Sequence, residues 1–189
     1  MIHESHPWRI RLSKDADLID RWAAKTKITD YRSFLIEQKV FLAAYAMRKL
    51  VEAKKLSSSF DHKNLSCRIF PAFKEKKASP WNSHHFDEFF NLDSPSESTL
   101  NIRSLMDLLV HSFLFIESVR EDNTIDGFLV NSDHKRSNLW FVNLSDFTAT
   151  MRHVAADYVS SSVIIWDDKA QQWREWRGHG EPPDDFCKK

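Results

Sequence analysis

Arg103, Asp107 and His111 have the residue types of an acid–base site and a spacing that places them on one side of a helix. Residues four apart lie one helical turn from each other, and Arg103 stands close to two turns before His111. Histidine can give or accept a proton near neutral pH, and arginine can neutralise a phosphate. The same spacing fits a structural role, in which His111 closes a buried helix and hydrogen-bonds to Asp107. The sequence leaves both interpretations open.

This segment resembles the HEPN helical ribonucleases and their inactive relatives. Their signature is an arginine, a polar residue, three further residues and a histidine. Asp107 and His111 occupy the polar and histidine positions, whereas Met106 stands at the arginine position and the nearest upstream basic residue is Arg103. In that family the arginine and histidine face a cleft between two copies. The resemblance therefore implies a metal-independent endoribonuclease that uses His111, Asp107 and Arg103, and it is compatible with a homodimer.

A polar turn between two predicted strands is a second candidate site. It contains Asp133, His134, Lys135 and Arg136, which offer charges of both signs. Loops carried by a rigid scaffold often hold binding contacts, so we predict that this turn binds a partner. The loosely patterned segment over residues 57–98 is a second region expected to make contacts.

Arginine and tryptophan are interleaved in two segments that lie far apart in the chain. One begins at Trp8 and ends at Arg11, and the other begins at Trp173 and ends at Arg177. Surfaces that bind single-stranded nucleic acid combine these residue types, although the acidic Asp167 nearby would repel phosphates. Nucleic acid is therefore one predicted partner class, and a protein is the other.

Two polar clusters have the residue types of metal ligands without the spacing of a known motif. Residues 84–88 hold two histidines and two acids. Adjacent side chains on a helix point roughly 100° apart, so His84 and Glu88 could share an ion but all four could not, and His62 and Cys67 upstream could complete the set. The run from Asp122 to Asp133, with Gly127 in sixth place, resembles a calcium loop, yet its flanks are predicted strands rather than helices. We predict no metal and no cofactor.

Composition excludes several enzyme classes. The 189 residues contain only three glycines, too few at the required spacing for a phosphate loop, a dinucleotide-binding fingerprint or a nucleophile elbow. The two cysteines form no metal or redox pair, and the first residues contain no apolar run. The net charge is zero, but residues 1–90 carry 17 basic and 11 acidic residues (+6), and residues 91–189 carry 10 and 16 (−6). We expect a soluble cytoplasmic protein without a membrane segment.

Hydrophobic periodicity predicts helices in the first half of the chain. Residues 8–12 alternate as in a strand, a helix follows from Ser13, and a long helix over residues 29–55 has apolar residues on two faces, typical of burial between neighbours. Thr29 or Asp30 suits its N-cap. The predicted core residues are Phe34, Phe41, Leu42, Tyr45, Leu109 and Phe113.

The second half predicts a sheet. After a helix over residues 99–111, β-rich runs cover residues 112–119, 125–131 and 138–144, with turns typical of an antiparallel meander. A helix to Tyr158 and a hairpin over residues 163–176 follow, and the tail from Gly178 is predicted to be loose. The fold class is α+β in one domain: a helical first half with a long buried central helix, then a β-meander, a further helix and a C-terminal hairpin.

Together these patterns predict a non-catalytic binding or regulatory protein of the bacterial cytoplasmic type, whose partner is a protein or a nucleic acid. The ribonuclease implied by His111 is the alternative.

Overall fold

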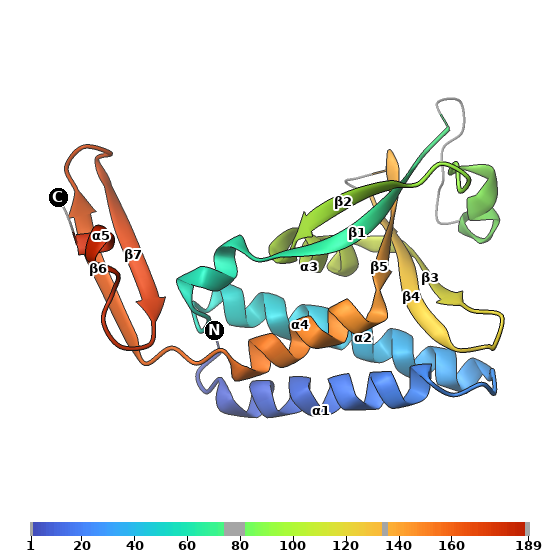
Figure 1. Cartoon of the computed structure of the whole chain (residues 1–189), viewed down its shortest axis with the longest axis horizontal. Helices are drawn as coiled ribbons and strands as arrows, with labels where there is room; N and C mark the ends of the chain where they lie inside the picture. The colour runs from blue at the N-terminus through green and yellow to red at the C-terminus, as the bar shows by residue number, and fades with distance from the viewer. Residues whose placement is uncertain (1, 74–81, 134–135, 188–189) are drawn as a thin grey trace.

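A five-stranded antiparallel sheet lies above a layer of helices (Figure 1). The computed structural model describes residues 2–73, 82–133 and 136–187. The strand order is β2-β1-β5-β4-β3. The strands are β1 (Asn64–Pro71), β2 (Ser96–Asn101), β3 (Ser112–Val119), β4 (Ile125–Ser132) and β5 (Asn138–Asn143). Strands β3, β4 and β5 form the antiparallel meander that the sequence predicts.

Helices α1 to α4 lie on one side of this sheet, where α3 and α4 contact its strands and α1 packs along α4 and α2 (Figure 1). The helices are α1 (His6–Ala23), α2 (Asp30–Glu52), α3 (Ile102–Val110), α4 (Leu144–Ala156) and α5 (Asp184–Cys187), with two short 3₁₀ helices, η1 (Ser58–His62) and η2 (Ser83–Glu88). Thr29 caps α2 as predicted, because its Oγ1 accepts a hydrogen bond from the Arg32 backbone N–H. The α+β fold class is confirmed.

The C-terminal hairpin forms a second, two-stranded sheet that extends beyond the main body (Figure 1). It consists of β6 (Ser161–Asp167) and β7 (Gln172–Gly178), close to the predicted bounds. Its base is fixed to η1, because the Arg177 N–H donates to Ser58 Oγ at 2.9 Å and its guanidinium lies 2.8 Å from Asp61 Oδ2. This anchor matters because an isolated two-stranded hairpin is marginally stable in water.

Alternating side chains of the sheet supply two apolar cores. Phe128, Val130 and Val142 face the helices, where they join Phe147 of α4. The opposite face packs around η2, with a smaller cluster formed by Phe70, Phe89, Phe90, Leu114, Leu139 and Phe141. The central strands β4 and β5 are therefore buried on both faces, which is why their sequences contain continuous apolar runs.

The predicted strand over residues 8–12 is wrong, because these residues lie within α1. The buried residues of α1 include Leu12, Ala16 and Ile19, which recur at helical spacing. This pattern extends over more residues than the strand-like alternation of residues 8–12, and the segment is helical. Pro7 occupies the first turn of α1, where its missing N–H removes no helical hydrogen bond.

The predicted core is partly wrong. Leu109 is buried, and Phe41 and Phe113 are half-buried, but Phe34, Leu42 and Tyr45 are about half exposed. The long helix is indeed α2, yet only the face with Ile36, Val40, Ala43, Ala44, Met47 and Leu50 meets the core. The sequence of α2 is apolar on two faces, so burial of both was predicted. In the structure, other elements of the core pack against only one of them.

The prediction of a loop-rich connection over residues 57–98 needs correction, because this segment supplies β1 and the start of β2. In β1 the alternating Leu65 and Cys67 are buried. In β2 only Leu100 is buried, so this edge strand shows almost no apolar pattern. The helix predicted from residue 99 begins at Ile102 instead, after the end of that strand. The tail after Gly178 contains α5, and the Arg174 guanidinium lies 4.9 Å from the centre of the Phe186 ring.

Among the described residues, none of the helices combines the length and the apolar character that a membrane crossing requires.

Candidate functional site

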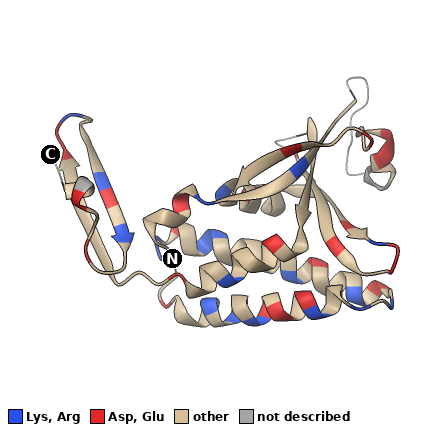
Figure 2. Ribbon diagram, in the orientation of Figure 1, with Lys and Arg blue, Asp and Glu red and all other residues tan. Residues whose placement is uncertain are grey.

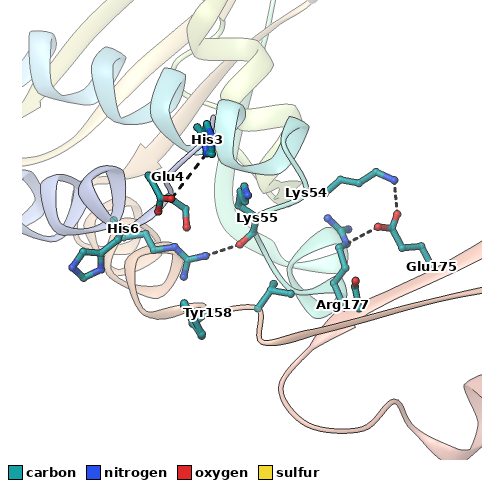
Figure 3. A pocket seen from close by; sticks show the side chains of 12 residues that line it. His3, Glu4, His6, Lys54, Lys55, Tyr158, Glu175 and Arg177 are labelled. Atoms are coloured by element: carbon teal, nitrogen blue, oxygen red, sulfur yellow. Dashed lines mark hydrogen bonds and ion pairs between the residues drawn. The ribbon is translucent and has the colours of Figure 1, made fainter. Parts of the chain in front are cut away.

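A pocket of about 620 Å³ opens where the start of α1, the end of α2 and the base of the hairpin meet (Figure 3). This volume lies in the range of small-molecule sites. Its walls come from segments far apart in the chain. The lining residues are His3, Glu4, Ser5, His6, Arg9, Lys54, Lys55, Tyr158, Val159, Ser162, Glu175 and Arg177.

Arg9 is the most unusual residue of this pocket. It is only 5% exposed, and its Nη2 donates to the backbone carbonyl of Lys55 at 2.5 Å. Its other two nitrogens, Nε and Nη1, are buried and have no hydrogen-bond partner among the described residues. A buried cationic donor without an acceptor is costly, because it has lost its water without full replacement.

The surroundings of Arg9 compensate its charge only in part. Burial lowers the pKa of the guanidinium, and the charges of Asp157 and Tyr158 oppose this effect. The guanidinium carbon lies 5.6 Å from the centre of the Tyr158 ring. Asp157 Oδ2 accepts hydrogen bonds from the N–H and the hydroxyl of Ser57. Among the described residues, the Arg9 side chain therefore has one hydrogen-bond acceptor, Lys55 O, and two enclosed nitrogens without one.

The end of α2 places two lysines at the pocket. The Lys54 N–H donates to Val51 O, and the Lys55 N–H donates to Leu50 O, which together form a Schellman C-cap. Lys54 therefore adopts a left-handed conformation with φ 55°, a position that glycine usually fills. The chain reverses here and brings both lysines to the pocket wall (Figure 3).

Acidic side chains neutralise part of the positive charge. Lys54 Nζ lies 2.5 Å from Glu175 Oε2, and Arg177 pairs with Asp61. Acidic and basic positions are interleaved along α1 and β7, so these elements do not divide by charge (Figure 2). Lys55 forms no ion pair with any residue that the structure describes. Glu4 lies at the rim with its carboxylate 4.0 Å from His3 Nδ1, so the lining keeps an excess of positive charge but also offers one exposed acidic group.

The structure brings two of the three predicted catalytic residues together with a third that was not predicted. Arg48 of α2 lies 3.3 Å from Asp107 Oδ1, and its Nη1 lies 3.5 Å from His111 Nε2. His111 is the exposed C-cap of α3. Arg48 also binds Glu52 at 2.8 Å, so two carboxylates already balance its charge. With Lys49, Arg48 lowers the pKa of Glu52 to about 2.

Arg103 takes no part in that cluster. It lines a separate cavity of about 40 Å³ with Phe60, Asp61 and Met106. Met106 itself is 1% exposed and belongs to the core, so the position that would hold the arginine of the ribonuclease signature faces inward.

The predicted binding turn is only partly visible. Asp133 and Arg136 are exposed and form an ion pair with each other, and Arg136 lies 5.8 Å from the centre of the Phe113 ring. His134 and Lys135 lie outside the described residues. Both described charges of this turn therefore already have partners within it.

Neither of the two ligand-like clusters gathers into a metal site within the described part of the chain, where no group of three His, Cys, Asp or Glu side chains converges. The calcium-like run begins in the β3–β4 turn, where Asp122 Oδ1 accepts from the N–H and the hydroxyl of Thr124, and then continues as strand β4. Asp126 pairs with Arg120 across the same turn. This is an Asx turn joining two strands.

The interleaved arginines and tryptophans were the sequence signal that pointed toward the pocket. Both segments reach it, since Arg9 comes from the first and Arg177 from the second. The pattern did not reveal Lys54, Lys55 or Tyr158, because nothing local in the sequence indicates that they approach Arg9. Comparison with protein-family models, curated proteins and solved structures found no match.

Proposed function

We propose that the protein is a non-catalytic binding protein whose pocket holds a multiply charged anion of the phosphate class. The observation that carries this proposal is Arg9, a buried guanidinium with two nitrogens that have no acceptor among the described residues. Both nitrogens are enclosed by protein, so the Arg9 side chain must turn toward the pocket before an anion there accepts from them and restores the hydrogen bonds that burial removed.

The neighbouring groups favour phosphate over a singly charged ion. Lys55 adds a second positive charge without an acidic partner in the described structure, and His3 and His6 add further nitrogen donors at the rim. The volume of about 620 Å³ exceeds what one small ion occupies, so an organic phosphate fits the size of the site better than chloride.

Pyrophosphate is a suitable first probe, because it supplies the charge without an organic group. A ligand present at ten times its Kd stabilises the folded state by about 1.4 kcal/mol. We expect pyrophosphate to raise the melting temperature of the wild type and to have little effect on Arg9→Met. Sodium chloride at the same ionic strength controls for screening.

Arg21→Met is the matched control variant. Arg21 lies in the last turn of the same helix and is exposed, so this variant removes the same charge far from the pocket. It should retain the pyrophosphate effect. An equal increase in all three proteins would indicate general salt stabilisation and would refute the proposed site.

A metal-independent ribonuclease is a second candidate, favoured by the contact between Arg48 and His111. A histidine beside a cation can act as a general acid on RNA, with a typical effect of roughly 10²–10⁴-fold. The test is cleavage of total RNA in EDTA by wild type, His111→Ala and Arg48→Met. Loss of cleavage in both variants supports this candidate, whereas no cleavage by wild type, or equal cleavage by all three, excludes it.

A further inference from the structure

One face of the C-terminal hairpin continues directly from the pocket. Ser162 pairs with Arg177, Ile164 with Glu175, and Trp166 with Trp173, so these six side chains share one face of the two-stranded sheet. Ser162, Glu175 and Arg177 line the pocket. The remaining three side chains therefore extend the same surface outward along the hairpin.

This outer part of the face is apolar and uncovered. Ile164 is 59%, Trp166 41% and Trp173 68% exposed. The two indole rings lie 5.2 Å apart in an edge-to-face arrangement. Exposed tryptophans on a projecting hairpin leave apolar surface in contact with water, which is unfavourable, and a flat apolar ligand could cover it.

The opposite face of the hairpin is occupied. Arg174 lies on it and contacts Phe186 of α5, and Trp176 on the same face is half-buried and packs close to Gly178. The C-terminal segment thus covers one face of the hairpin and leaves open the face that joins the pocket.

We propose that the pocket and this open face together bind single-stranded nucleic acid, with phosphates at Arg9 and Lys55 and bases stacked on Trp166 and Trp173. This inference rests on the proposed anion site and names its ligand class. Single-strand sites combine a cationic path for the backbone with aromatic side chains that stack on bases. A duplex keeps its bases stacked inside and cannot offer them to these indoles.

Charge along the route is mixed, because Asp167 and Asp168 follow Trp166 at the tip of the hairpin, where Arg174 lies 3.8 Å from the Asp167 carboxylate and Lys169 comes next in the chain. Glu175 is the acidic residue between Trp173 and Arg177 in β7, and Lys54 and Arg177 both lie against its carboxylate. The acidic side chain therefore does not face the ligand unpaired. Trp173 and Arg177 are four residues apart, about 13 Å along a strand, so a short oligonucleotide can reach from the indoles to the pocket.

The experiment measures the fluorescence anisotropy of labelled oligouridine and oligothymidine of about 12 nucleotides, titrated with the protein at several salt concentrations. Trp173→Ala should raise Kd about tenfold and leave the salt dependence unchanged. Arg9→Met should raise Kd and make the slope of log K against log salt shallower by about 0.7. Tyr31→Ala removes an equally exposed aromatic ring from α2 and should leave both quantities unchanged.

The outcomes separate this inference from the function on which it rests. If pyrophosphate stabilises the protein through Arg9 but no oligonucleotide binds, the anion site stands and the nucleic-acid inference is refuted. If Trp173→Ala binds like wild type, or if a duplex of equal length binds as tightly, the tryptophan face plays no part and the inference is also refuted. If pyrophosphate has no Arg9-dependent effect and no oligonucleotide binds, both proposals fail. Tighter binding of either oligonucleotide, with the expected effects of both variants, supports the inference and distinguishes RNA from DNA.

Discussion

The middle and the first turn of α1 accommodate buried charge in different ways. In the middle, Asp15 is 5% exposed and lies 2.9 Å from Lys39 of α2, which is 7% exposed, while Arg11 approaches its second oxygen at 3.0 Å. In the first turn, Arg9 is equally buried but has only one hydrogen-bond acceptor among the described residues, the carbonyl of Lys55.

This difference separates a charge that the fold uses from a charge that is left for a ligand. The Asp15–Lys39 ion pair joins α1 to α2, and the two buried charges are opposite and 2.9 Å apart, although Asp15 Oδ1 has no well-directed hydrogen bond among the described residues. Arg9 lines a pocket and retains unsatisfied donors. Removing Asp15 or Lys39 is therefore expected to reduce stability strongly, whereas removing Arg9 is expected to affect ligand binding more than folding.

Asp15→Ala is expected to give the largest effect. It leaves the Lys39 ammonium buried without its partner, and breaking a buried pair in this way typically costs about 3–5 kcal/mol. Urea denaturation of wild type and variant measures the change in the free energy of unfolding. The double variant Asp15→Leu, Lys39→Met removes both charges and should recover most of the loss. A loss below about 1 kcal/mol in Asp15→Ala would show that the pair does not hold the helices together.

The sequence predicted those parts of the fold that local patterns specify. The meander strands carry continuous apolar runs, and the cap of α2 follows from one residue type at one position, Thr29. Strand β2 escaped prediction because it lies at the sheet edge with one buried side chain, Leu100. This strand is held by its pairing with β1, and no short stretch of the sequence includes both strands.

The candidate site was predictable only in part for a similar reason. Arg9 and Arg177 belong to segments whose arginine and tryptophan content is typical of surfaces that bind single-stranded nucleic acid, although acidic residues lie nearby. The contact between Arg9 and Lys55 joins residues 46 apart in the chain, and the unsatisfied nitrogens become evident only from that contact. Likewise, Phe34 has the residue type of a core position, and its exposure follows from which side of α2 the other elements occupy.

Lys54→Gly tests whether the left-handed backbone of Lys54, at the pocket wall, lowers the stability of the fold. Lys54 occupies the left-handed position of the helix cap, which disfavours side chains by roughly 1–2 kcal/mol. Its exposed pair with Glu175 contributes less, about 0–1 kcal/mol. We therefore expect a net gain in stability of about 0.5–1 kcal/mol, measured by urea denaturation. Lys54→Ala keeps the strain and loses the pair, so it should show no gain, and an equal gain in both variants would contradict the explanation.

Arg9→Met is expected to change stability by less than about 1 kcal/mol. The variant loses the hydrogen bond to Lys55, but it also removes a buried charge that the protein solvates incompletely, and these effects oppose each other. Denaturation without ligand gives this value, which should be far below that of Asp15→Ala. A loss of similar size in both variants would place Arg9 with the structural charges and remove the contrast between the two regions.

Glu117 extends the comparison to a carboxylate, with the smallest expected effect. It lies on β3, and burial raises the pKa of its carboxyl group, as does the charge of Glu37, whereas a hydrogen bond with Ser33 and the charge of Arg32 lower it in part. Because the folded-state pKa lies above the usual value of 4.5, the folded protein holds this proton more firmly than the unfolded chain. Its contribution is therefore fully present below about pH 4.5 and is lost as the pH rises through the raised pKa.

Glu117→Gln should remove this pH dependence while keeping the shape of the side chain. The free energy of unfolding of wild type, measured against pH in steps upward from the usual carboxyl pKa, should fall relative to that of the variant, because only wild type must ionise a half-buried group. Glu121→Gln, an exposed position in the following turn, serves as the control and should follow wild type. If wild type and Glu117→Gln keep a constant difference over this range, Arg32 and Ser33 satisfy the carboxylate fully, and Glu117 belongs with Asp15 among the matched charges. If the difference grows in favour of the variant, Glu117 joins Arg9 as a buried charge that its surroundings satisfy only in part.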